Sequence, residues 1–121
     1  MDTGQDRELE PVHIKAGADL LLQGDLGIPA DAHGIVLFAH GSGSSRQSPR
    51  NRFVASALRE ENLATLLVDL LTLNEEAEDA VTGHLRFDIE LLAERLIGVT
   101  DWLLQNPKTK DLRIGYFGAS T

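Results

Sequence analysis

Residues 112–121 have the sequence LRIGYFGAST, and this stretch decides the fold that we predict for the chain. Its apolar first part, residues 112–117, is typical of a buried β-strand. A Gly-x-Ser turn follows the strand directly, with Gly118 at its start and Ser120 at its end. The glycine lets two backbones approach closely, and a strained turn lifts a serine hydroxyl clear of the sheet. The pattern predicts a nucleophile elbow in which Ser120 is the nucleophile.

Strand and helix patterns alternate from residue 35 onward, which predicts an α/β fold with a mostly parallel sheet flanked by helices. We predict strands at 12–16, 18–22, 35–39 and 65–70, and helices from about residue 48 and over about 87–104. Ser48 followed by Pro49 is a helix start signal, because serine caps a helix and proline fits its first turn. The sequence therefore predicts one domain.

The remaining segments are predicted to be turns and loops. Gly17 and Gly24-Asp25 are expected to end the first two strands. Residues 74–85 are acidic and are predicted to form a solvated loop, not a metal site. Residues 1–10 are expected to be a flexible lead-in, which leaves 11–121 as the predicted domain.

The composition of the chain disfavours some partners and excludes chemistry that depends on cysteine. The net charge of −8, from 19 acidic and 11 basic residues, disfavours nucleic acid or an anionic membrane as the main partner. The chain has no cysteine, which excludes disulfides, a thiolate nucleophile and a zinc site built on sulfur. Residues 1–10 lack the apolar core of a signal peptide, and no apolar run approaches the ~18 residues of a membrane span. We therefore expect a soluble, cytoplasmic protein.

The segment His40-Gly41-Ser42-Gly43 comes directly after the predicted strand at 35–39. Glycines leave backbone N–H groups uncovered, so an oxygen that gains negative charge can bind there. The segment is predicted to supply one side of an oxyanion hole, with the amide of Thr121 on the other side and His40 as a loop-shaping donor. A flexible connection and a phosphate cradle are the alternatives. The two glycine-rich phosphate motifs fail, one for lack of Gly-Lys-Ser/Thr and the other because Arg46 replaces its third glycine.

Three cations follow the glycine segment: Arg46, Arg50 and Arg52. They are candidates for binding a carboxylate or phosphate group, and the alternative is that they pair with the surplus acids of the chain. Asp69 ends a predicted strand and is expected to cap a loop. No histidine has a partner at metal-ligand spacing, so no metal site is expected.

Together these segments resemble the dienelactone hydrolase-like branch of the α/β-hydrolases. The resemblance is carried by residues 38–46, 48–51, 64–72, 86–89 and 115–121. It implies hydrolysis of small ester or lactone substrates without a cofactor. It also implies that Ser120 is the nucleophile and that Gly41–Gly43 and Thr121 donate to the oxyanion. Dienelactone hydrolase itself uses a cysteine at the nucleophile position, so Ser120 favours a general serine esterase.

The acid and the histidine of this family follow the nucleophile and have no counterpart in residues 1–121. The expectation is a truncated serine hydrolase that is inactive alone, because Ser120 lacks a base. The strand at 112–117 would then have an open edge, which predicts self-association or a completing partner. The alternative is a non-catalytic module for anion binding or assembly that keeps the first half of the fold.

Overall fold

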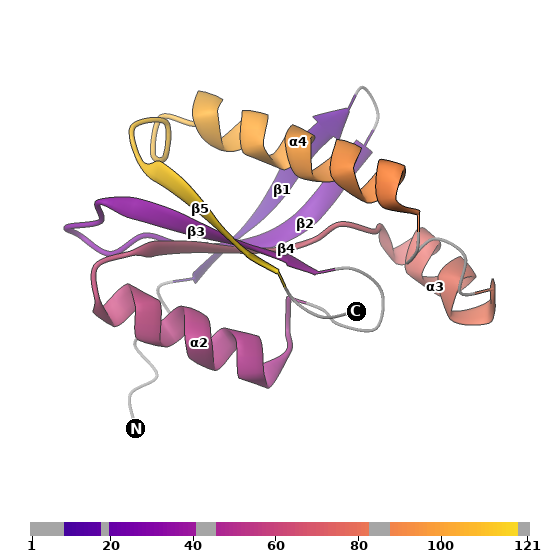
Figure 1. Ribbon diagram of the computed structural model, residues 1–121, viewed down its shortest axis with the longest axis horizontal. Coiled ribbons are helices and arrows are strands. Elements are labelled where there is room, and N and C mark those ends of the chain that lie inside the picture. The colour runs from indigo at the N-terminus through magenta and orange to yellow at the C-terminus, as the bar shows by residue number, and fades with distance from the viewer. Residues whose placement is uncertain (1–8, 18–19, 41–45, 83–87, 119–121) are drawn as a thin grey trace.

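The computed structural model describes residues 9–17, 20–40, 46–82 and 88–118. The strands are β1 (Leu9–Gly17), β2 (Leu20–Gly27), β3 (Gly34–His40), β4 (Ala64–Asp69) and β5 (Arg113–Gly118), and the helices are α2 (Pro49–Glu60), α3 (Leu73–Thr82) and α4 (Ile89–Gln105). The strands form one sheet with helices on both faces (Figure 1). The predicted fold class is confirmed.

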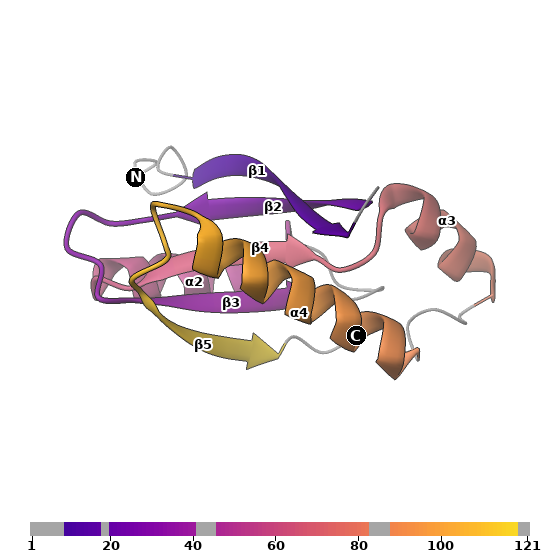
Figure 2. The same ribbon diagram turned by 90° about the horizontal axis from the view of Figure 1, so that it is seen from above.

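The sheet is mixed, and its strand order is β1-β2-β4-β3-β5 (Figure 2). β1 and β2 form an antiparallel hairpin, and β2 continues antiparallel to β4. β3 lies parallel to both β4 and β5. Parallel strands need crossover connections. α2 lies in the connection from β3 to β4, and α3 and α4 lie in the connection from β4 to β5, which reaches the other side of β3. The part of the sheet that follows residue 34 is therefore the parallel part that the alternating pattern predicts.

Two apolar cores lie on opposite faces of the sheet, one under α4 and the other under α2 (Figure 1). Successive side chains of a strand point to opposite faces, so Leu37 joins Val99 and Leu103 of α4, whereas Phe38 joins Ala55 of α2. Every residue of β4 is buried, as expected for a strand covered on both sides.

The acidic segment 74–85 contains a helix, so the prediction of a loop there is wrong. Thr72 and Glu75 form a reciprocal capping box: Glu75 Oε1 accepts from the Thr72 amide at 2.9 Å, and Thr72 Oγ1 accepts from the Glu75 amide at 3.2 Å. Acidic residues in the first turn also interact favourably with the positive end of the helix dipole. These two effects start α3 in spite of its high charge.

The predicted turn at Gly24-Asp25 is also wrong, because both residues lie inside β2. Gly24 pairs with Val12 of β1 and with Val68 of β4, so strands on both sides hold this segment extended. β1 begins at Leu9, two residues before the predicted start of the domain at residue 11, and residues 1–8 lie outside the described part of the chain. Pairing across the sheet overrides the local turn signal here.

α4 packs very closely on β1 at Gly98, and replacement of this glycine by alanine is expected to destabilise the fold. A Cβ at residue 98 would lie 2.7 Å from the Ala16 carbonyl oxygen and 2.9 Å from the Ala16 Cβ. Overpacking of this kind costs about 1–3 kcal/mol, more than alanine gains in helix propensity. Urea denaturation of Gly98→Ala measures the loss. Gly115→Ala is the matched control, because its Cβ meets no described atom within 4 Å; equal losses in both variants would contradict the packing argument.

Candidate active site

β3 and β5 end at the same edge of the sheet, and the two predicted catalytic segments follow these strands in the sequence. The strands are parallel neighbours, and Ala39 is in register with Gly118. The chain therefore leaves both strands at the same level, at the carboxyl edge where ligands bind in open α/β sheets. Gly41, Ser42 and Gly43, together with Ser120 and Thr121, lie outside the described residues, so their predicted roles stay predictions.

His40 is fully buried at the end of β3, and both of its ring nitrogens have partners. Nδ1 lies 3.3 Å from the Val68 carbonyl oxygen, and Nε2 lies 3.0 Å from the Asn51 side-chain nitrogen. Nδ1 must donate to the carbonyl, so Nε2 of the neutral ring accepts from Asn51. Burial lowers the pKa of His40, although the Val68 carbonyl and Asp69 oppose the shift. His40 thus donates a hydrogen bond from β3 to β4, and its predicted loop-shaping role stays a prediction.

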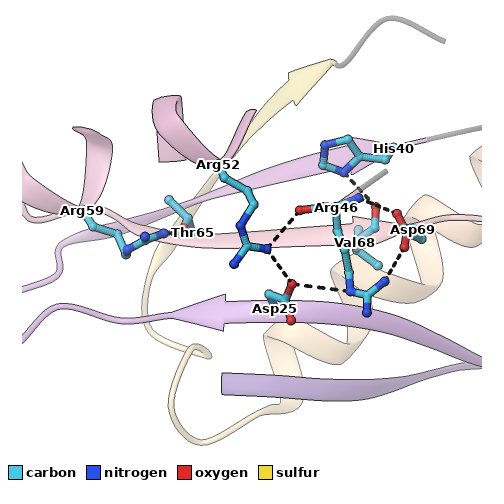
Figure 3. Close-up of polar contacts among 8 residues, drawn as sticks. All are labelled: Asp25, His40, Arg46, Arg52, Arg59, Thr65, Val68 and Asp69. Carbon is cyan, nitrogen blue, oxygen red and sulfur yellow. Dashed lines mark hydrogen bonds and ion pairs between the residues drawn. The ribbon is translucent and has the colours of Figure 1, made fainter. Parts of the chain in front are cut away.

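Arg46 and Asp69 form a two-point contact at the other side of the glycine segment (Figure 3). The Arg46 amide donates to Asp69 Oδ1 at 2.7 Å, and Arg46 Nη1 donates to Asp69 Oδ2 at 2.8 Å. The Asp69 side chain is 9% exposed. The predicted loop-capping role of Asp69 is confirmed.

Asp25 of β2 extends this network to two arginines (Figure 3). Its Oδ2 lies 3.4 Å from Arg46 Nε and 3.2 Å from Arg52 Nη1. Arg46 and Arg52 thus pair with acidic residues of the same chain. This is the second of the two roles that the sequence predicts for these arginines, the first being the binding of an anion. Arg50 lies exposed on α2.

Sequence reasoning missed Asn51 and Asp25 as members of this site. Asn51 is buried on α2 and points its amide at His40, but a lone asparagine in a helix carries no chemical motif. Asp25 was assigned to a turn, which hid its place on β2 opposite Arg46. The surplus of acids and the three nearby arginines were the only signal for the network.

A cavity of about 270 Å³ lies beside Asp69, between β2 and the start of α3. Its lining residues are Leu21, Gln23, Asp69, Leu71, Thr72, Leu73, Asn74 and Glu76. Burial raises the pKa of Glu76, and the negative charge of Asp69 raises it further, while Arg46 opposes the shift. The cavity has room for a small molecule at the carboxyl end of β4.

Arg95 of α4 connects α3 to the carboxyl end of β4. Its Nη1 donates to the Leu70 carbonyl at 2.8 Å and to Glu75 Oε1 at 2.7 Å, and its Nη2 donates to Glu75 Oε2 at 2.7 Å. The hydrogen bonds from Arg95 lower the pKa of Glu75 from 4.5 to about 2. A planar, two-bond contact of this kind fixes the position of both side chains.

The Glu75–Arg95 pair is expected to make stability depend on pH in acid. Because the folded-state pKa of Glu75 lies below the unfolded value, its stabilisation is complete above about pH 4.5 and is lost as the pH falls toward about 2. Thermal unfolding of the wild type and of Glu75→Gln between pH 6 and pH 2.5 tests this. The difference in melting temperature between the two proteins should shrink as the pH falls; a constant difference would contradict the assignment.

Within the described ranges, no group of three or more acidic or histidine side chains could hold a metal ion. In the same ranges, no helix is long and apolar enough to cross a bilayer.

The structure of dienelactone hydrolase from Anabaena variabilis superposes on this chain with a TM-score of 0.87 and 59% sequence identity. The resemblance to the dienelactone hydrolases is confirmed. The superposition covers 94% of this chain and 53% of that protein. Est1E from Butyrivibrio proteoclasticus shares the fold at 18% identity, with a TM-score of 0.67 over 91% of this chain and 40% of Est1E. No family model matches the sequence.

Two curated proteins of Mycobacterium tuberculosis, from strains CDC 1551 and H37Rv, are each 54% identical to this chain over 112 residues. Their names describe them provisionally as phosphoribosyl transferases. The match covers 93% of this chain but 24% of each relative. The chain thus spans about half of the solved hydrolase and about a quarter of the curated relatives.

Proposed function

We propose that this chain forms the first part of a serine hydrolase that acts on small carboxylic ester or lactone bonds. The observation that carries the proposal is the parallel register of Ala39 and Gly118. Because of this register, β3 and β5 end side by side, and the glycine segment follows β3 while the Gly-x-Ser turn follows β5 in the sequence. The similarity to a dienelactone hydrolase supports the same assignment.

In the proposed reaction, the Ser120 oxygen attacks the carbonyl carbon of the substrate and transfers its proton to a histidine base. Amides of Gly41–Gly43 and of Thr121 stabilise the tetrahedral oxyanion. The intermediate collapses to an acyl-serine, and the leaving oxygen takes the proton from the histidine. Water then attacks the acyl-serine by the same route in reverse and frees the acid. The base and its acid partner would come from outside residues 1–121, and no cofactor is needed.

Two features support a small substrate without a strong negative charge. The cavity beside Asp69 measures about 270 Å³, just below the range of roughly 300–1,000 Å³ for small-molecule sites. Its ionisable lining residues are the carboxyl side chains Asp69 and Glu76, and Arg46 is already paired with Asp69. The cytoplasmic location remains a prediction.

A hybrid protein tests this function without relying on residues 1–121 alone. It joins this chain to the part of the Anabaena variabilis dienelactone hydrolase that the superposition leaves uncovered. We expect the hybrid to hydrolyse a short-chain aryl ester at ~1 s⁻¹ or faster, a typical enzyme rate. The 121-residue chain should remain far below that rate. A folded hybrid without esterase or lactonase activity would contradict the proposal, and fast turnover by the short chain would reveal an unassigned base.

The alternative function is a non-catalytic module that binds an anion or assembles with another chain. The names of the Mycobacterium tuberculosis relatives favour a phosphate-bearing ligand, although the match covers only 24% of those proteins. The ion pairs of Arg46 and Arg52 argue against it, because their charge is already neutralised by Asp25 and Asp69. Calorimetric titration with inorganic diphosphate at two salt concentrations distinguishes an anion-binding module from the hydrolase. Salt-sensitive binding that survives Ser120→Ala would favour the alternative.

A further inference from the structure

His40 and Arg46 flank residues 41–45, which include the predicted oxyanion donors Gly41–Gly43, and both flanking residues are attached to β4. On the N-terminal side, His40 donates through Nδ1 to the Val68 carbonyl, and the His40 carbonyl accepts from the Leu70 amide at 2.9 Å. On the C-terminal side, Arg46 binds the Asp69 carboxylate through its amide and its guanidinium. Three consecutive residues of the chain, 68–70, therefore fix the two ends of a five-residue connection.

The two anchors differ in chemistry. The His40 anchor is neutral, and its ring is locked between Val68 and Asn51. The second anchor is ionic and uses both oxygens of Asp69, one of them on a backbone amide. A carboxylate that served only to pair with Arg46 would not need to bind this amide. The amide contact fixes the main chain where the segment rejoins described structure.

We propose that Asp69 is a positioning residue that holds the oxyanion segment in place for the reaction of Ser120. The inference rests on the proposed hydrolase function. An oxyanion hole stabilises charge only if its amide donors are oriented before the charge develops. Asp69 holds the main chain at Arg46, and the contact between His40 and Val68 holds the chain at residue 40.

The first test measures the attachment on the 121-residue chain itself. Asp69→Asn keeps one acceptor for the Arg46 amide but replaces the second oxygen by an NH₂ group, which cannot accept from the guanidinium. We expect exchange of the Arg46 amide hydrogen, which Asp69 accepts, to accelerate about 10-fold or more in Asp69→Asn. Asp25→Asn is the matched control, because Asp25 contacts the same guanidinium but not the Arg46 amide. Equal exchange in the wild type and Asp69→Asn would overturn the proposal.

The second test measures the consequence for catalysis in the hybrid protein. Asp69→Asn should lower kcat about 10- to 100-fold with little change in KM, because the misplaced donors act in the transition state. Glu10→Gln is the control, because it alters an exposed side chain of β1 that pairs with Lys108, and it should stay within about 3-fold of the parent kcat. A role in stability alone would lower the melting temperature and leave kcat unchanged, and that result would overturn the proposal. If Asp69→Asn does not fold, Asp69→Glu takes its place, since it keeps the charge but moves the carboxylate outward.

Ser120→Ala in the same hybrid separates the two hypotheses. Loss of activity in Ser120→Ala with normal kcat in Asp69→Asn would overturn the positioning role and leave the hydrolase function standing. Full activity in Ser120→Ala would overturn the hydrolase function, and with it the catalytic role of Asp69.

Discussion

Replacement of Ser120 by alanine in the hybrid protein is expected to lower kcat for a short-chain aryl ester by about 10³-fold to 10⁶-fold. The serine supplies the oxygen that becomes acylated, and its removal leaves only the oxyanion donors and substrate binding, which give a small residual rate over water. KM should change little, because the hydroxyl contributes mainly to the reacting state. Initial rates with the purified variant measure the effect.

Ser48→Ala is the matched control for this loss. Ser48 precedes α2, and its side chain makes no capping hydrogen bond, so its removal should leave kcat within about 2-fold. A Ser120→Ala protein that retains more than about a tenth of the parent kcat would show that another residue carries the reaction. Circular dichroism of both variants confirms that the comparison is between folded proteins.

Replacement of Arg95 by methionine is expected to destabilise the fold by about 3–5 kcal/mol, the largest effect on stability that the structure suggests. The Arg95 side chain is 9% exposed, and methionine would leave the Glu75 carboxylate without its cationic partner and the Leu70 carbonyl without the Arg95 donor. α3 would lose its connection to α4 at the same time. Urea denaturation of the chain, followed by circular dichroism, measures the change in unfolding free energy.

Lys108→Met provides the comparison with an exposed pair. Lys108 lies 3.3 Å from Glu10, and these side chains are 63% and 56% exposed, so its loss should cost less than about 0.5 kcal/mol. The double variant with Arg95→Met and Glu75→Gln should recover part of the loss, because no buried charge stays unpaired. Similar losses for Arg95→Met and Lys108→Met would contradict the assigned importance of burial.

The parallel part of the fold could be predicted because its signals are local. The apolar run of β3, the Ser48-Pro49 start of α2 and the apolar spacing along α4 each depend on neighbouring residues. The Thr72–Glu75 capping signal was present in the sequence, but the acidic composition around it favoured a loop. β2 runs through Gly24 because two flanking strands hold it, and no local pattern contains that information.

The candidate site also contains residues that local motifs reveal and residues that only the tertiary structure reveals. Its motif residues can be found from the sequence, because His40 ends β3 and Ser120 comes soon after β5 in the chain. Asn51 and Asp25 meet the site only through the packing of α2 and β2 against β4, so their roles depend on tertiary structure. The register that aligns Ala39 with Gly118 is likewise a property of the sheet. Motifs therefore indicate the chemistry, whereas the residues that hold the motifs in place need the fold.

Covalent labelling of the hybrid protein with a fluorophosphonate tests the central claim most directly. An activated serine gives its proton to the base, attacks the phosphorus, displaces fluoride and keeps the phosphonyl group, whereas an ordinary serine hydroxyl is too weak a nucleophile to react. Mass spectrometry of the intact protein and of its peptides should find one adduct, on Ser120, and none in Ser120→Ala. Esterase activity without an adduct on Ser120, or an adduct on a different residue, would contradict the account.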